Sequence, residues 1–131
     1  MPVNGRFLLD TNIIIALFAK DPVIRERMAS ASEVFVPCIA LGELFFGARG
    51  SSRAQDNLSR IREFAFHSPV LQCNAGTAEM YGDVKNRLRH RGQPIPENDL
   101  WIAAVARQYS LTLVTRDKHF DVIEDLMIEL W

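Results

Sequence analysis

The sequence is short of three features that would narrow its function at once: cysteine, excess charge of one sign, and long hydrophobic runs. Its 131 residues include only two cysteines, Cys38 and Cys73, and both have apolar neighbours. We therefore expect buried thiols in a reducing compartment rather than a disulfide. No Cys/His spacing suggests a zinc site, and we expect the three scattered histidines, His67, His90 and His119, to be surface residues.

The charge is almost balanced, because fifteen Lys and Arg residues face sixteen Asp and Glu residues, for a net charge of −1. A nucleic-acid partner would therefore have to meet a local basic patch. The best candidate is KNRLRHRG, Lys85 to Gly92, where Lys85, Arg87, Arg89 and Arg91 flank the apolar stripe of a predicted helix. The same cations would equally complement a helix dipole and keep the surface solvated, so both interpretations stay open.

No hydrophobic run suggests a membrane segment. The longest one near the N-terminus, residues 13–19, is too short to cross a bilayer, and residues 1–5 lack the basic start of a signal peptide. We expect a cytoplasmic protein without membrane contact. The length, the 48% hydrophobic content and the lack of repeats or linkers predict a single domain over residues 1–131.

Short apolar runs alternate with helical patterns along the chain. Strands are predicted at residues 7–9, 34–36, 111–114 and 126–130, with a weaker one at 70–72. This alternation predicts an α/β domain with a mostly parallel central sheet and helices on both faces, although the pattern does not give the order of the strands.

Three helices have recognisable ends. Asp21 followed by Pro22 is typical of a helix start, and Ser52 with Gln55 has the spacing of a capping box. A third helix carries an apolar stripe and is expected to stop at Gly92, before Pro94.

Two acidic residues follow predicted strands. In RFLLDTNIII, Asp10 comes directly after the first strand, and in LTLVTRD, Asp117 comes shortly after a later one. A turn or a helix cap would explain either residue alone. In α/β folds, however, the functional crevice lies at the carboxyl ends of the strands, where both residues are expected.

Two further acids are set in apolar helices. Glu43 is the only charge in CIALGELFFGA, residues 38–48, and we expect it on a largely covered helix. A salt bridge to an arginine, or a solvent-facing side chain, would explain it as well. Asp99 opens the apolar helix of PENDLWIAAVA, where it would also serve as a cap or dipole partner.

The four acids would form one functional site if they converged on one crevice. At about 4 Å and an effective dielectric of about 20, each pair of like charges costs roughly 4 kcal/mol. Such a cluster suits a hard divalent cation, which prefers oxygen ligands, and Mg²⁺ or Mn²⁺ fits best. The sequence thus favours a metal site made of Asp10, Glu43, Asp99 and Asp117.

Four segments of the chain resemble a known family. LLDTN, ALGELFFGA, NDLWIAAVA and LVTRDKHF are similar to the motifs of the PIN domain, in the same order and at similar spacing. The resemblance covers nearly the whole chain and is strongest to the VapC-type toxins of bacterial toxin–antitoxin pairs.

The resemblance implies a PIN-like fold and a metal-dependent ribonuclease that acts on RNA. It implies that Asp10, Glu43, Asp99 and Asp117 are both catalytic and metal-binding, with Asp10 and Asp99 as the most direct ligands. Polar positions of the family that order the site match Asn12 and Thr115. A homodimer and a cognate antitoxin, encoded alongside, are also implied.

Two other classes of protein remain as alternatives. A Mg²⁺-dependent phosphoacceptor signalling domain shares the size, the α/β pattern and the acids at strand ends. It needs an acid at the end of a middle strand, whereas the second predicted strand runs into Pro37 and Cys38. A non-catalytic binding module would have no reason to carry Glu43 within an apolar helix.

Overall fold

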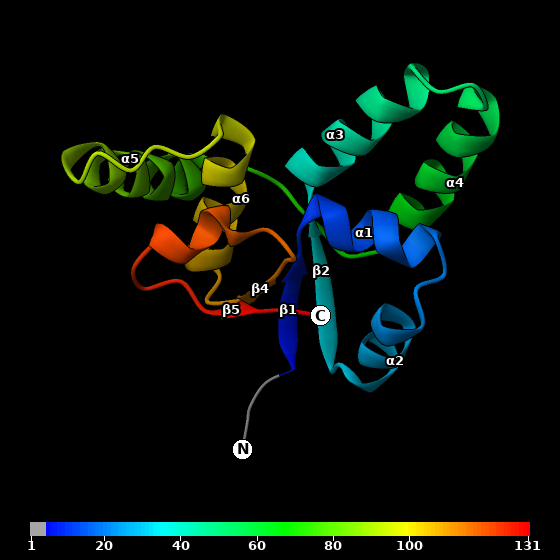
Figure 1. Ribbon diagram of the computed structural model, residues 1–131, viewed down its shortest axis with the longest axis horizontal. Coiled ribbons are helices and arrows are strands. Elements are labelled where there is room, and N and C mark those ends of the chain that lie inside the picture. Colours follow the sequence, from blue (N-terminus) through cyan, green and yellow to red (C-terminus); the bar gives the residue numbers. More distant parts are fainter. Residues whose placement is uncertain (1–4) are drawn as a thin grey trace.

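Five strands form a parallel sheet at the centre of the structure. The computed structural model describes residues 5–131 (Figure 1); residues 1–4, on which part of the signal-peptide expectation falls, lie outside this range. The sheet order is β3-β2-β1-β4-β5 and every pairing is parallel. All five predicted strands are present: β1 (Arg6–Leu9), β2 (Glu33–Pro37), β3 (Val70–Leu71), β4 (Thr112–Val114) and β5 (Ile128–Glu129).

Helices cover the two faces of this sheet, as the alternating pattern predicts. One layer holds α1 (Thr11–Phe18), α2 (Pro22–Ser30), α3 (Cys38–Arg49) and α4 (Ala54–Phe66). The other holds α5 (Ala75–His90), α6 (Glu97–Gln108) and the short 3₁₀ helix η1 (Lys118–Val122). No helix within residues 5–131 is long and apolar enough to cross a membrane.

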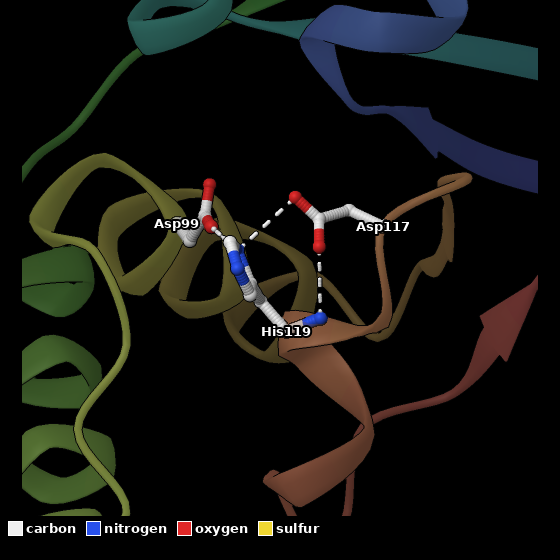
Figure 2. Close-up of side chains that lie close together, drawn as sticks. All are labelled: Asp99, Asp117 and His119. Atoms are coloured by element: carbon white, nitrogen blue, oxygen red, sulfur yellow. Dashed lines mark hydrogen bonds and ion pairs between the residues drawn. The ribbon is translucent and has the colours of Figure 1, made fainter.

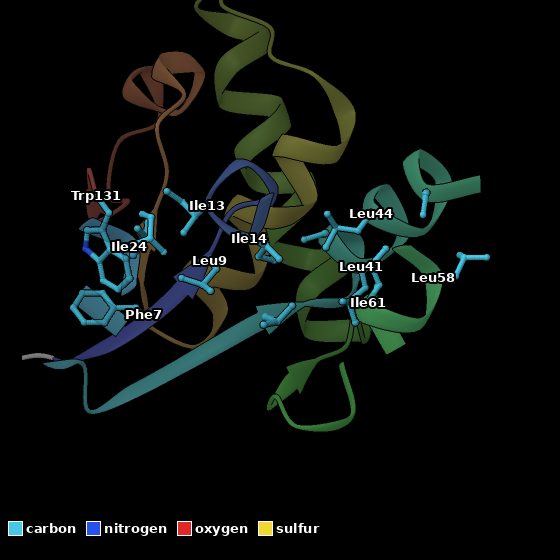
Figure 3. Close-up of a cluster of buried hydrophobic side chains, with 14 residues drawn as sticks. Phe7, Leu9, Ile13, Ile14, Ile24, Leu41, Leu44, Leu58, Ile61 and Trp131 are labelled. Atoms are coloured by element: carbon cyan, nitrogen blue, oxygen red, sulfur yellow. The ribbon is translucent and has the colours of Figure 1, made fainter. Parts of the chain in front are cut away.

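The central strands are apolar on both sides because each face meets a separate core. Phe7 and Leu9 of β1 pack into a cluster with α1 to α4, shown in Figure 3, whereas Leu8 packs with α5 and α6. Successive side chains of a strand point to opposite faces, so a strand buried on both sides reads as one continuous apolar run.

Two of the predicted helix ends are confirmed by the structure. Asp21 caps α2 through the backbone N–H groups of Val23 and Ile24, and Gly92 has a φ of 66° just beyond α5, as expected.

The predicted capping box at Ser52 and Gln55 is wrong. α4 begins at Ala54, and its N-cap residue makes no side-chain hydrogen bond. The neighbouring Ser51 closes the preceding turn instead, by donating to the Ala48 carbonyl at 2.6 Å. The structure forms a capping box at the start of α5, between Asn74 and Thr77, where the third helical residue is Thr rather than the usual Glu or Gln.

The expectation of two buried thiols is also wrong. Cys73 is exposed and Cys38 is partly exposed. Cys73 follows β3, a two-residue strand at the edge of the sheet, and the chain leaves the covered interior there.

The caps give a direct stability test. Asn74→Ala removes a side chain that accepts a hydrogen bond from the Thr77 backbone, so we expect the free energy of unfolding to fall by about 1–2 kcal/mol. Ser52→Ala is the matched control and should change it by less than about 0.5 kcal/mol. Urea unfolding of both variants measures the difference, and equal losses would contradict the assignment of the cap.

Candidate metal centre

The four predicted acids lie around the carboxyl ends of β1 and β4. These two strands are neighbours in the sheet, yet the chain passes through β2 and β3 between them. The connections therefore run to opposite sides of this pair, which makes it the switch point where α/β folds place their ligands. Asp10 follows β1 directly, Asp117 follows β4, and Asp99 and Glu43 come from α6 and α3.

Asp10 is the most buried of the four acids, with 4% of its surface exposed. One carboxylate oxygen accepts from the Thr11 backbone N–H at 2.8 Å, and the other from the Thr115 hydroxyl at 2.7 Å. Burial raises the pKa of Asp10 to about 6; the charges of Asp99 and Glu43 add to this rise and the two hydrogen bonds oppose it. Asp10 thus caps α1 and also takes part in a cluster of negative charge.

Asp99 and Asp117 meet across His119 (Figure 2). The ring Nδ1 of His119 lies 3.1 Å from Oδ2 of each carboxylate, and its backbone N–H donates to the other oxygen of Asp117 at 2.9 Å. Asp99 stands in the first turn of α6, but the N-cap position belongs to Pro96. Its carboxylate is therefore directed at His119 rather than used as a cap.

The electrostatics of Asp99 are those of a crowded carboxylate. Burial raises its pKa above the ordinary value, and the charges of Asp117 and Glu43 act in the same direction. Hydrogen bonding to His119 opposes the rise. Each acid of the quartet therefore lies close enough to another to affect its ionisation or to be affected by it.

Glu43 is held by a hydroxyl and not by an arginine. It accepts a hydrogen bond from the Thr11 side chain at 2.6 Å and is absent from the ion pairs formed by residues 5–131. The expectation of a largely covered helix is wrong, because Phe46 of the same helix is 84% exposed. α3 packs with one side on the core and on α4, and its opposite side faces solvent.

Two residues of the site were missed by sequence reasoning. Thr11 lies beside the predicted Asp10, but nothing in its local pattern indicates a partner in α3. His119 is exposed, as expected, yet it contacts Asp99, twenty residues earlier in the chain. Of the predicted ordering residues, Thr115 contacts the site and accepts from the Asp117 backbone at 2.9 Å, whereas Asn12 accepts from the backbone of Arg116, the neighbour of Asp117, at 3.4 Å.

The donor set fits a hard cation. One ligand atom each from Asp99, Asp117 and His119 lie within 4.8 Å of one another, which is the compact part of the cluster. Asp10 and Glu43 stand outside this compact group, although Glu43 acts electrostatically on both Asp10 and Asp99. Mg²⁺ is usually held by one or two carboxylates and several waters, so a compact pair with further acids nearby suits it.

An apolar groove opens beside Glu43. Its volume is about 400 Å³, and it lies between α1, α3 and α4. The lining includes Thr11 and Glu43 from the site, together with Ile15, Phe18, Leu44, Gly47, Asn57, Arg60 and Ile61. The groove and the acidic cluster therefore share two polar side chains.

The basic segment at Lys85 to Gly92 is largely neutralised by ion pairs. Lys85 pairs with Glu97, and Arg87 pairs with Asp83 and Asp125.

Arg91 pairs with Glu124 at 2.6 Å. Within the described part of the chain, Arg89 is the one predicted cation of this segment that forms no ion pair. The structure thus favours the interpretation as a solvated helix end over that of an open cationic patch.

Comparison with known proteins places this geometry in context. The PIN domain family matches residues 7–126. The chain is 35% identical to Ribonuclease VapC1 of Haemophilus influenzae over 95% of this chain and 97% of the relative. It is 32% identical to the tRNA(fMet)-specific endonuclease VapC of Shigella flexneri over 96% and 98%. It also resembles the crystal structure of DNA-bound VapBC from Salmonella typhimurium, with a TM-score of 0.89, 32% identity and coverage of 96% and 98%.

The raised pKa of Asp10 predicts how stability depends on pH without metal. In the folded protein Asp10 holds its proton up to about pH 6, above the value of 3.8 for the unfolded chain. Its contribution is thus full below about pH 4 and is lost as pH rises through about 6. Asn does not ionise, so Asp10→Asn should gain about 3 kcal/mol over wild type between these limits.

Unfolding in a metal chelator at about pH 4.5 and about pH 7.5 should show roughly 2 of these 3 kcal/mol, because the Asp10 side chain of the unfolded protein is already mostly ionised at pH 4.5. Asp121→Asn is the control, since Asp121 is exposed. A difference between Asp10→Asn and wild type that stays constant across the two pH values would contradict the prediction.

Proposed function

Because this chain belongs to the PIN-domain family, we propose that it is an endoribonuclease toxin of the VapC type. It hydrolyses phosphodiester bonds of RNA and is neutralised by a cognate antitoxin. The observation that carries the proposal is the convergence of Asp99, Asp117 and His119 beside the buried Asp10, at the switch point of the sheet. The similarity to named VapC ribonucleases over nearly their whole length supports it.

We propose that Asp10, Glu43, Asp99 and Asp117 hold a divalent cation, Mg²⁺ or Mn²⁺, and make up the catalytic site. A cation bound there supplies a polarised water and stabilises charge on the phosphate in the transition state. The protein holds the carboxylates in place: Thr11 donates to Glu43, and Thr115 fixes both Asp10 and the backbone of Asp117. The arrangement favours Asp117 beside Asp99 as a direct ligand, with Asp10 and Glu43 bound directly or through water.

The protein exerts no strong electrostatic attraction that would draw RNA to the acidic site, because its net charge is −1. Arg89 is the cation of the basic segment that remains available for a phosphate, since the others predicted there pair with carboxylates. We propose that its contribution to binding is modest and depends on salt.

We propose that the antitoxin covers the apolar groove between α1, α3 and α4. The groove is lined by aliphatic and aromatic side chains and reaches Thr11 and Glu43, so a segment seated in it contacts the acidic cluster at Glu43. Exposed apolar side chains beside such a groove are typical of interaction surfaces, and Ile15 is more than half exposed there.

The homodimer and the cytoplasmic location remain parts of the proposal. Two strongly exposed aromatic residues, Phe46 on α3 and Phe66 on α4, offer apolar surface for a second copy of the chain. An RNA substrate and an antitoxin made in the same cell support action in the cytoplasm. The phosphoacceptor alternative is not favoured, because the relatives described above are ribonucleases.

Metal dependence is the central test of the nuclease. Purified protein should cleave RNA, with initiator tRNA and an unstructured RNA as probes, when Mg²⁺ or Mn²⁺ is present. EDTA should abolish cleavage. Asp99→Asn should reduce the rate by roughly 100-fold or more, because the charge that holds the cation is gone. Undiminished cleavage in excess EDTA would exclude the proposed chemistry.

Glu97→Gln is the matched control, because Glu97 also carries a charge in the first turn of α6 but pairs with Lys85. It should cleave at nearly the wild-type rate. Mg²⁺ should raise the melting temperature of wild type and of Glu97→Gln by mass action, and that of Asp99→Asn much less. Equal increases in all three proteins would remove Asp99 from the ligand set.

The groove assignment is tested with glycines. A Cβ atom added at Gly47 or at Gly82 meets no other atom within 4 Å, so both positions accept a side chain without strain. Gly47 lines the groove and Gly82 lies on α5. Gly47→Gln should weaken binding of the cognate antitoxin by roughly tenfold or more, and Gly82→Gln should not. Calorimetric titration measures the affinity of both variants for the antitoxin. Equal affinities would indicate that the antitoxin binds another surface.

A further inference from the structure

The two cysteines of the chain lie at the ends of neighbouring strands. β2 and β3 are parallel, and their register pairs Val36 with Val70 and Pro37 with Leu71. Cys38 is the next residue after β2 and begins α3, whereas Cys73 follows β3 by two residues. The paired residues Pro37 and Leu71 thus bring the segments that carry Cys38 and Cys73 to the same edge of the sheet.

The thiols are also close enough to influence each other. Burial raises the pKa of the Cys73 thiol above its ordinary value, and the neighbouring Cys38 thiol adds to the rise. Cys73 is exposed and Cys38 partly exposed, so an external reagent reaches the pair.

We propose that Cys38 and Cys73 form a reversible disulfide and are a modification site that responds to the thiol–disulfide balance of the cell. In cytosolic proteins of ordinary organisms, such bonds are usually transient and redox-sensing rather than structural. The inference depends on the two thiols alone and does not rest on the nuclease proposal.

The reaction needs a low-molecular-weight disulfide of the glutathione class as the oxidant. The exposed Cys73 thiolate attacks one sulfur of that disulfide, a mixed disulfide forms, and one small thiolate leaves. The Cys38 thiolate then attacks the Cys73 sulfur and releases the second small thiolate, so the protein dithiol is oxidised and the small disulfide is reduced to two thiols. Excess dithiothreitol runs the sequence backwards.

The bond would join two layers of the fold. α3, which carries Glu43, starts at Cys38, and the segment from Cys73 leads across to α5 on the other face of the sheet (Figure 1). A bond between these points closes a loop of residues 38–73 and removes many conformations of the unfolded chain. The melting temperature should therefore rise on oxidation by about 5 °C or more.

Oxidised glutathione is the probe for the experiment, which uses the full chain in the presence of EDTA. Peptide mapping without reductant should show the peptides of Cys38 and Cys73 linked to each other within one chain. The melting temperature should rise at the same time, and dithiothreitol should reverse both changes. A product that stops at glutathione bound to Cys73, or that links Cys73 residues of two chains, would overturn the proposal.

Two single variants complete the design. Cys38→Ser should accumulate the mixed disulfide at Cys73 without gaining stability, because no second thiol resolves it. Cys73→Ser should take up glutathione much more slowly than Cys38→Ser, since the exposed thiol is missing. If Cys38→Ser does not fold, Cys38→Ala serves in its place. Rapid modification of Cys73→Ser at Cys38 would contradict the assigned order of attack.

Discussion

The parallel pairing of β1 with β4 is the constraint on which the other features of this structure depend. It aligns Leu9 with Val114, and the Asp10 backbone N–H donates to the Val114 carbonyl at 2.9 Å. Thr115, the first residue after β4, thereby comes within 2.7 Å of the Asp10 carboxylate. A shift of this register by one residue would move every side chain of the shifted strand to the opposite face of the sheet and separate the two side chains.

Neutral donors hold Asp10 and Glu43, and His119 lies between Asp99 and Asp117, although the charges of the four acids repel one another. Hydroxyl and backbone groups of Thr11 and Thr115 satisfy Asp10 and Glu43, and no arginine or lysine of residues 5–131 forms an ion pair with any of the four acids. Packing of the core offsets the repulsion between the carboxylates, since residues 102–106 of α6, which follow Asp99, are fully buried. A fold stabilised in this way keeps its negative charge uncompensated and so keeps it available to a cation.

In the proposed function, the antitoxin groove and the acidic site have two residues in common. Thr11 belongs to the network of Glu43 and also lines the apolar groove, and Glu43 itself lies at the border between groove and cluster. A partner that fills the groove would therefore disturb the hydrogen bond between these two side chains without entering the compact group at Asp99. This shared border gives a physical reason why an inhibitor of such a nuclease would bind beside the acids and not only over them.

The sequence by itself determined the α/β class and the five strands, because burial periodicity and strand ends are local properties of the chain. It also led to the proposal of the four acids. It also indicated Thr115 and Asn12, through resemblance. It failed at Ser52, because α4 begins only at Ala54, and at Cys73, which follows a strand at the edge of the sheet.

Only the tertiary structure decided the strand order, the contact of His119 with Asp99, and the ion pairs that neutralise Lys85, Arg87 and Arg91. Apart from the pair of Arg87 with Asp83, these side-chain contacts join residues from twelve to thirty-eight positions apart, and the pattern around any one of them carries no information about its partner. Local patterns fix which face of an element is buried; the packing of distant elements fixes which polar groups meet.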